Sequence, residues 1–205
     1  MSVNLQKGQK VDLTKGNAGL KKLMAGLGWD EAPRQKGGLL SGILGGQGGK
    51  QDIDCDAMAF LLGANGKLSS SKDVVFFNNL KHPSGCVTHQ GDNLTGAGEG
   101  DDEQILIDLL SLPKQYERIV IAVSIYKANE RNQHFGMIKN AFIRLVDVDT
   151  NKELCKYDLS DDYPNMTAMI FGEVYRYNGE WKFGAIGEGL RVWSVTDLSA
   201  RYGLA

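Results

Sequence analysis

Short apolar runs alternate with glycine-rich turns along most of this chain. Runs rich in Val, Ile, Leu and Phe that are bounded by Gly, Asn, Asp or Pro are typical of β-strands joined by tight turns. The pattern predicts nine strands, over residues 9–13, 22–27, 57–62, 74–77, 103–109, 119–126, 141–146, 169–176 and 180–186. Residues 118–126 are apolar at nearly every position, which predicts a strand at the centre of a sheet, buried on both faces.

Two Asn-Gly pairs mark expected hairpins, because this dipeptide readily takes the positive φ angles of a type I′ turn. Asn178-Gly179 separates two strand-like runs, and Asn65-Gly66 follows another. Helical patterns are few: one turn at 113–116, an ambiguous stretch at 130–139 and a helix within 190–202. We therefore expect an all-β, antiparallel β-sandwich with a few short helices, forming one domain over residues 1–205.

Composition narrows the class of protein. The chain has 205 residues, of which 42% are hydrophobic, and a formal net charge of −2. No basic tract indicates a nucleic-acid partner. The three cysteines are odd in number and widely separated, which favours free thiols in a reducing compartment over a disulfide framework. With no apolar leader at Met1 and no long apolar run, we expect a cytoplasmic protein.

A glycine-rich insertion occupies residues 37–50 and contains four aliphatic side chains. Its glycines do not follow the spacing of a phosphate-binding loop, because Leu44 stands where that loop needs glycine and Gln51 where it needs Ser or Thr. We expect a flexible loop. Its aliphatic residues could also dock on a partner or cover a sheet edge.

The segment 91–103 contains five carboxylates among glycines and has no Lys or Arg. Two like charges about 4 Å apart repel by about 1 kcal/mol in water and by more near protein, so these residues repel each other unless a cation binds them. Ca²⁺ takes six to eight oxygen ligands, and glycines let the backbone turn its carbonyls inward. The expected ligands here are Asp92, Asn93, Asp101, Asp102 and Glu103. An acidic surface loop is the alternative.

A second acidic run, Asp52-x-Asp54-x-Asp56, lies upstream. It does not begin an EF-hand, because the turn glycine would fall at Ala57 and the bidentate glutamate at Gly63. On a strand, Asp54 and Asp56 would share one face and could bind one ion together, or simply form a solvated edge. We expect the two acidic segments to meet at one end of the sandwich around one or two Ca²⁺ ions.

The sequence is also compatible with two other kinds of chemistry, a metal-dependent phosphohydrolase and a zinc or metalloid site. The same carboxylates could hold Mg²⁺ or Mn²⁺ in a phosphohydrolase, with His89 as the general base. The spacing His82-x-x-x-Cys86-x-x-His89 could bind zinc or react with a metalloid, although an ordinary turn with a packed Cys86 explains it equally. Arg144, on a predicted strand, either pairs with a carboxylate of the acidic segments or faces solvent.

Several motifs, in order along nearly the whole chain, resemble the TerD family of tellurium-resistance and general stress proteins. They are SVNLQKG, GLGWD, DCDAMAFLL, GDNLTGAGEGDDE, NAFIRLV and FGEVYRYNGEWKF. The resemblance implies a calcium-binding β-sandwich without established catalytic activity that acts in resistance to tellurite and other chemical stress. It places the family's acidic motifs on Asp54 and Asp56 and on Asp92, Asn93, Asp101, Asp102 and Glu103. The expected partners are calcium, other stress-response proteins or the inner face of the membrane. The insertion at 37–50 is longer than usual for the family.

Overall fold

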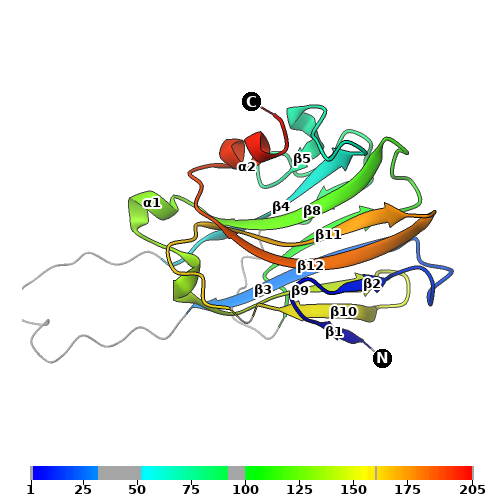
Figure 1. Cartoon of the computed structure of the whole chain (residues 1–205), viewed down its shortest axis with the longest axis horizontal. Helices are drawn as coiled ribbons and strands as arrows, with labels where there is room; N and C mark the ends of the chain where they lie inside the picture. Colours follow the sequence, from blue (N-terminus) through cyan, green and yellow to red (C-terminus); the bar gives the residue numbers. More distant parts are fainter. Residues whose placement is uncertain (1, 32–51, 92–99, 160, 205) are drawn as a thin grey trace, which may run out of the picture.

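The computed structural model describes residues 2–31, 52–91, 100–159 and 161–204, and it forms two six-stranded sheets (Figure 1). Sheet A runs in the order β1 (Val3–Leu5), β10 (Lys152–Asp158), β9 (Ile138–Asp147), β3 (Lys22–Glu31), β7 (Glu103–Asp108) and β6 (Val87–His89). Sheet B runs β2 (Lys10–Asp12), β12 (Glu180–Leu190), β11 (Ala168–Tyr177), β8 (Tyr116–Ile125), β4 (Cys55–Gly63) and β5 (Val74–Val75). Every neighbouring pair is antiparallel except β1 and β10. The predicted all-β sandwich is confirmed.

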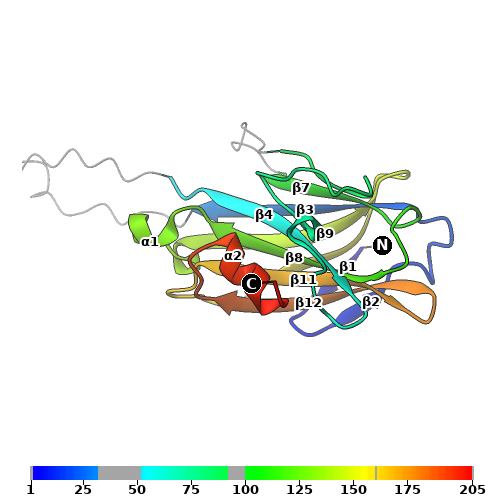
Figure 2. The ribbon, with the colours of Figure 1, turned by 90° about the horizontal axis from the view of Figure 1, so that it is seen from above.

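The uninterrupted apolar run of β8 has a direct structural cause. One face of the strand, carrying Ile119 and Ile121, lies in the main core between the two sheets. Val120 and Ala122 on its other face belong to a second buried cluster, which also contains Leu198 of helix α2 (Val195–Arg201). Figure 2 shows α2 lying over the strands of sheet B. Because both faces of β8 are covered from Ile119 to Val123, neither face carries polar residues over that stretch.

The two Asn-Gly pairs form different turns. Asn178 and Gly179 have φ angles of 53° and 80° and directly join β11 to β12, as the type I′ prediction requires. Asn65 and Gly66 do not form the predicted type I′ turn, because that turn needs a positive φ at both residues and only Gly66 has one, of 72°. The one-turn helix η1 (Ser71–Asp73) lies between this turn and β5, so the connection from β4 is long.

The helices are shorter than the sequence pattern suggested. The stretch 130–139 divides into α1 (Ala128–Arg131) and η2 (Phe135–Met137). The expected helix within 190–202 begins only at Val195, because β12 continues to Leu190. Among the described residues, no helix combines the length and the hydropathy needed to cross a membrane.

The described parts of both acidic segments lie at one end of the sandwich. β3 ends there at Glu31 and β7 begins there, with Leu27 of β3 paired to Glu103. β4 begins at the same end, where Ile53 N–H donates to Glu31 Oε1 at 2.5 Å. Figure 1 shows α1 at this end as well. The glycine-rich insertion at 37–50, together with Asp92 and Asn93, lies outside the described residues.

Candidate metal centre

Four carboxylates lie near enough to one buried thiol, at the start of β4, for their charges to act on it. Cys55 is 6% exposed and points into the core between the sheets. The pKa of this thiol is raised well above its usual value, first by burial and then by the charges of Asp56, Glu103, Asp54 and Asp102. Two of these residues come from the upstream acidic run and two from the downstream segment. The described parts of the two segments therefore lie near each other, whereas a shared set of metal ligands stays a prediction.

Glu103 joins the two sheets at this end. Its side chain is buried, and its Oε2 atom accepts the backbone N–H of Ala57. The edge strand β5 pairs with β4 only through Ala59 and Phe60. The Glu103 carboxylate thus accepts a hydrogen bond from β4 at a position that β5 does not reach. The buried N–H of Ala57 gains an acceptor, and the buried charge of Glu103 gains a donor.

A buried histidine faces the same carboxylate. His89 Nε2 lies 3.4 Å from Glu103 Oε2, and His89 Nδ1 accepts the backbone N–H of Gly91 at 3.0 Å. Because Nδ1 is an acceptor, the proton of a neutral ring lies on Nε2, on the side of Glu103. Nε2 is buried and forms no hydrogen bond with any described residue, so His89 lies beside Glu103 without being hydrogen-bonded to it.

Asp102 comes directly before β7 and adds one more backbone hydrogen bond to the pairing of β7 with β3. Its backbone N–H donates to Leu27 O at 2.7 Å, and its carboxylate Oδ2 accepts the N–H of Trp29 at 2.7 Å. Burial raises the pKa of Asp102, and the neighbouring charges of Asp30 and Asp101 add to that rise against the opposing bond from Trp29. Like-charge neighbours of this kind favour the binding of a cation.

Asp101 has a different environment from the other carboxylates. Its side chain is fully buried and forms a two-bond ion pair with Arg144, with Nε to Oδ1 at 2.7 Å and Nη2 to Oδ2 at 3.0 Å. The carboxylate lies over Gly26, where any Cβ atom would collide with it. Of the two roles left open for Arg144, the pairing with an acidic segment is the one observed.

The described part of the predicted ligand set is thus divided. The charges of Asp54, Asp56, Asp102 and Glu103 all act on Cys55, whereas Asp101 faces Arg144, and Asp92 and Asn93 lie outside the described residues. Over the described ranges, no three His, Cys, Asp or Glu side chains are arranged to hold a metal ion. The calcium ligands remain a prediction. The donors that the two segments offer are hard carboxylate oxygens, the type that Ca²⁺ prefers.

Comparison with known proteins assigns the chain to a family. The sequence model of the TerD domain matches residues 1–202. The chain belongs to the TerD family.

The TerD-family relatives match over their full length. The chain is 50% identical over 202 residues to "Stress response protein SCP2" of Bacillus subtilis (strain 168), covering 98% of this chain and 100% of that protein. It is 45% identical over 204 residues to "Tellurium resistance protein TerD" of Serratia marcescens, covering 100% of this chain and 98% of that protein. A solved structure, the "unknown function protein SAV2460", superposes with a TM-score of 0.62 at 26% identity, covering 87% of this chain and 94% of that one.

Of the three residues that suggested zinc, His82 and Cys86 both contact Ser84 in this TerD-family structure, but His89 does not. His82 contacts Asp73 and Ser84, whereas His89 faces Glu103. Cys86 is 3% exposed, and its thiol contacts Ser84 Oγ. The alternative of a turn with a packed Cys86 describes the observed structure. His82 and Asp73 are nine positions apart in the sequence, and no spacing rule would have predicted the contact between their side chains.

Proposed function

We propose that this TerD-family protein is a non-enzymatic calcium-binding protein of the stress response, acting inside the cell. The observation that carries the proposal is that Glu103 of the downstream acidic segment accepts the backbone N–H of Ala57, the residue directly after Asp56 of the upstream run. The names of relatives, which include a stress response protein and tellurium resistance proteins, support the role in stress resistance. The three free, buried cysteines support a reducing compartment.

Calcium would act by holding the acidic segments together. Burial raises the pKa of Asp102, and the charges of Asp30 and Asp101 raise it further, so a cation beside Asp102 would relieve like-charge repulsion. One or two Ca²⁺ ions would be held by Asp54, Asp56, Asp102 and Glu103, with Asp92, Asn93 and Asp101 as further ligands. Because such a site is assembled only in the folded chain, the binding energy adds to the stability of that end of the sandwich.

An exposed aromatic surface lies beside the cluster and supports a role in binding a partner. A cleft of about 690 Å³ is lined by Asp56 together with Phe77, Tyr126 and Trp193. These three rings are 41%, 38% and 74% exposed and line one cleft, and contiguous exposed apolar surface of this kind marks binding sites. We propose that calcium at Asp56 orders this surface for another stress-response protein or for the inner face of the membrane.

Thermal melting in calcium and in a chelator tests the proposal. At a free Ca²⁺ concentration about one hundred times the dissociation constant, the free energy of unfolding should rise by about 2.7 kcal/mol. For a chain of this size, that raises the melting temperature by about 5–10 °C. Mg²⁺ should have a smaller effect, since it requires near-octahedral geometry and loses water reluctantly.

Two substitutions sharpen the calcium test. Asp56→Asn removes one charge from the cluster and should reduce the calcium-dependent shift. Asp158→Asn is the matched control, because Asp158 is exposed and pairs with Lys156 on β10. Equal melting temperatures in calcium and in chelator, together with no heat in calorimetric titration, would show that the cluster does not bind calcium.

The phosphohydrolase alternative gains no support from His89. A general base must reach the reacting water, but His89 is 2% exposed, and its two ring nitrogens face Glu103 and the N–H of Gly91. Arg144, which could stabilise a phosphate charge, is directed at Asp101 and Glu153. Hydrolysis of a phosphodiester with Mn²⁺ that disappears in Asp102→Asn would reverse this conclusion.

A further inference from the structure

A tight turn between Lys81 and Thr88 places a serine at the surface directly above a buried histidine. Gly85 N–H donates to His82 O at 2.8 Å, and His82 N–H donates to Val87 O at 2.9 Å. Gly85 has a φ of 76°, which completes the turn without strain because it has no side chain. The turn exposes Ser84 and directs His82, which is 4% exposed, into the protein.

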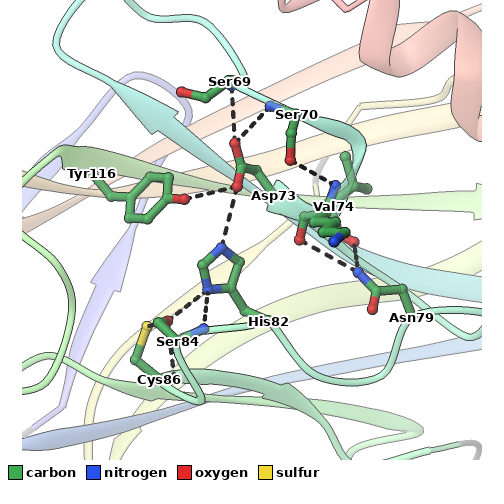
Figure 3. Close-up of polar contacts among 10 residues, drawn as sticks. Ser69, Ser70, Asp73, Val74, Asn79, His82, Ser84, Cys86 and Tyr116 are labelled. Atoms are coloured by element: carbon green, nitrogen blue, oxygen red, sulfur yellow. Dashed lines mark hydrogen bonds and ion pairs between the residues drawn. The ribbon is translucent and has the colours of Figure 1, made fainter.

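The ring of His82 connects Ser84 to a carboxylate (Figure 3). His82 Nδ1 lies 2.6 Å from Ser84 Oγ and also accepts the Ser84 backbone N–H at 3.2 Å. Nδ1 is therefore the acceptor nitrogen, and the proton of the neutral ring lies on Nε2. Nε2 faces Asp73 Oδ1 at 3.3 Å.

Asp73 is fixed by groups from three segments. Its Oδ2 atom accepts the backbone N–H groups of Ser69 and Ser70 at 2.9 Å each, and its Oδ1 atom accepts the Tyr116 hydroxyl at 2.7 Å. The ring of His82 lies edge-on to that of Tyr116, with centroids 5.1 Å apart. A carboxylate held in this way fixes the orientation of the imidazole and stabilises its protonated form.

The remaining contacts of Ser84 direct its proton toward the histidine. The backbone N–H of Cys86 donates to Ser84 Oγ at 3.4 Å, and the Cys86 thiol also contacts this oxygen. Either atom of the Ser84–Cys86 contact can be the donor, and when the thiol donates, the Ser84 hydroxyl hydrogen is left for His82 Nδ1. Ser84 as the nucleophile, His82 as the base and Asp73 as the group that orients the base are thus linked by successive contacts.

We propose that Ser84 is an activated nucleophile that is covalently modified by activated acyl or phosphoryl compounds. In this step Ser84 Oγ forms a bond to the carbonyl carbon or the phosphorus, and the bond to the leaving group breaks with its electron pair. The Oγ proton passes to His82 Nδ1 and then to the leaving group or to solvent. Compared with a serine protease, the two ring nitrogens exchange roles, which neutral imidazole permits. Asp73 is a positioning residue.

Labelling of the full-length protein with a fluorophosphonate, followed by intact mass measurement and peptide mapping, tests this proposal. The adduct forms with loss of fluoride. We expect labelling at Ser84 to be on the order of 10²-fold faster than at serines without a base. Ser111 is the matched comparison, because it is exposed and its hydroxyl donates to the Asp108 carboxylate at 2.9 Å rather than to a histidine.

Substitutions test the separate roles of Ser84, His82 and Asp73. Ser84→Ala should abolish the rapid adduct, Ser111→Ala should leave it unchanged, and His82→Asn should slow it to the rate of Ser111. Asp73→Asn should alter the pH profile of the rate, which a purely structural role would not do. Wild-type protein unfolded in urea should label Ser84 and Ser111 equally, and this comparison holds even if the His82 variant does not fold. Equal rates in the native protein, or an adduct on Cys86, would overturn the proposal.

Discussion

Replacing Arg144 with methionine should lower the free energy of unfolding by about 3–5 kcal/mol, measured by urea denaturation in the presence of a chelator. The Asp101 side chain is fully buried, and Arg144 donates to both of its oxygens. Methionine keeps much of the apolar stem but removes both donors, so the carboxylate would stay buried without its main counter-charge. The chelator prevents a bound ion from replacing the guanidinium.

A double-mutant cycle separates the lost charge pair from lost packing. Asp101→Asn in the Arg144→Met background should recover part of the loss, because it removes the uncompensated charge. Arg118→Met is the matched control: Arg118 pairs with Glu173 at 2.8 Å, but its side chain is 45% exposed, and we expect a loss of about 1 kcal/mol or less. If Arg144→Met is no more destabilising than Arg118→Met, the buried pair does not hold the acidic segment in place.

The strands with strong local patterns were predictable from the sequence, and those that depend on distant partners were not. β8 is buried on both faces, and β11 and β12 are joined by a two-residue turn, so their signals are local. β1 has only three residues and pairs in parallel with β10, placing Val3 opposite Cys155. β10 mixes charged and apolar residues, because it lies near the sheet edge, and its pattern therefore resembles that of a loop.

The candidate site was predictable as a meeting of two segments but not as a set of contacts. Oxygen-rich composition indicated that the segments meet, and Glu103 does accept the backbone N–H of Ala57, next to Asp56. Sequence alone could not show that Asp101 faces Arg144, because the bend at Asp102 interrupts the strand alternation just before β7 begins. Nor could it show that Gly26 leaves the space that the Asp101 carboxylate occupies.

Replacing Asp73 with alanine should lower the free energy of unfolding by at least about 3 kcal/mol. The carboxylate accepts hydrogen bonds from the backbone of Ser69 and Ser70, from the Tyr116 hydroxyl and from His82 (Figure 3). Each buried donor left without a partner costs about 1–3 kcal/mol. Urea denaturation at neutral pH measures the loss. A loss below about 1 kcal/mol would mean that water or neighbouring groups replace the carboxylate.

The same residue gives the stability a specific dependence on acid. Burial raises the pKa of Asp73, but the hydrogen bonds from Tyr116, Ser69, His82 and Ser70 outweigh it and hold the pKa below its usual 3.8. A lowered folded-state pKa means that the contribution of Asp73 is present above pH 3.8 and is lost as the pH falls through the folded value.

Comparison of the wild type with Asp73→Asn isolates this contribution, because the carboxylates of the acidic cluster titrate in both proteins. The difference in unfolding free energy between the two should stay constant above about pH 5 and shrink as the pH falls below 3.8. Parallel curves down to the acid transition would mean that Asp73 takes up its proton equally in the folded and unfolded states. In that case the carboxylate would still be ionised at neutral pH, but its contacts with Tyr116, Ser69, Ser70 and His82 would favour the charged form no more than water does.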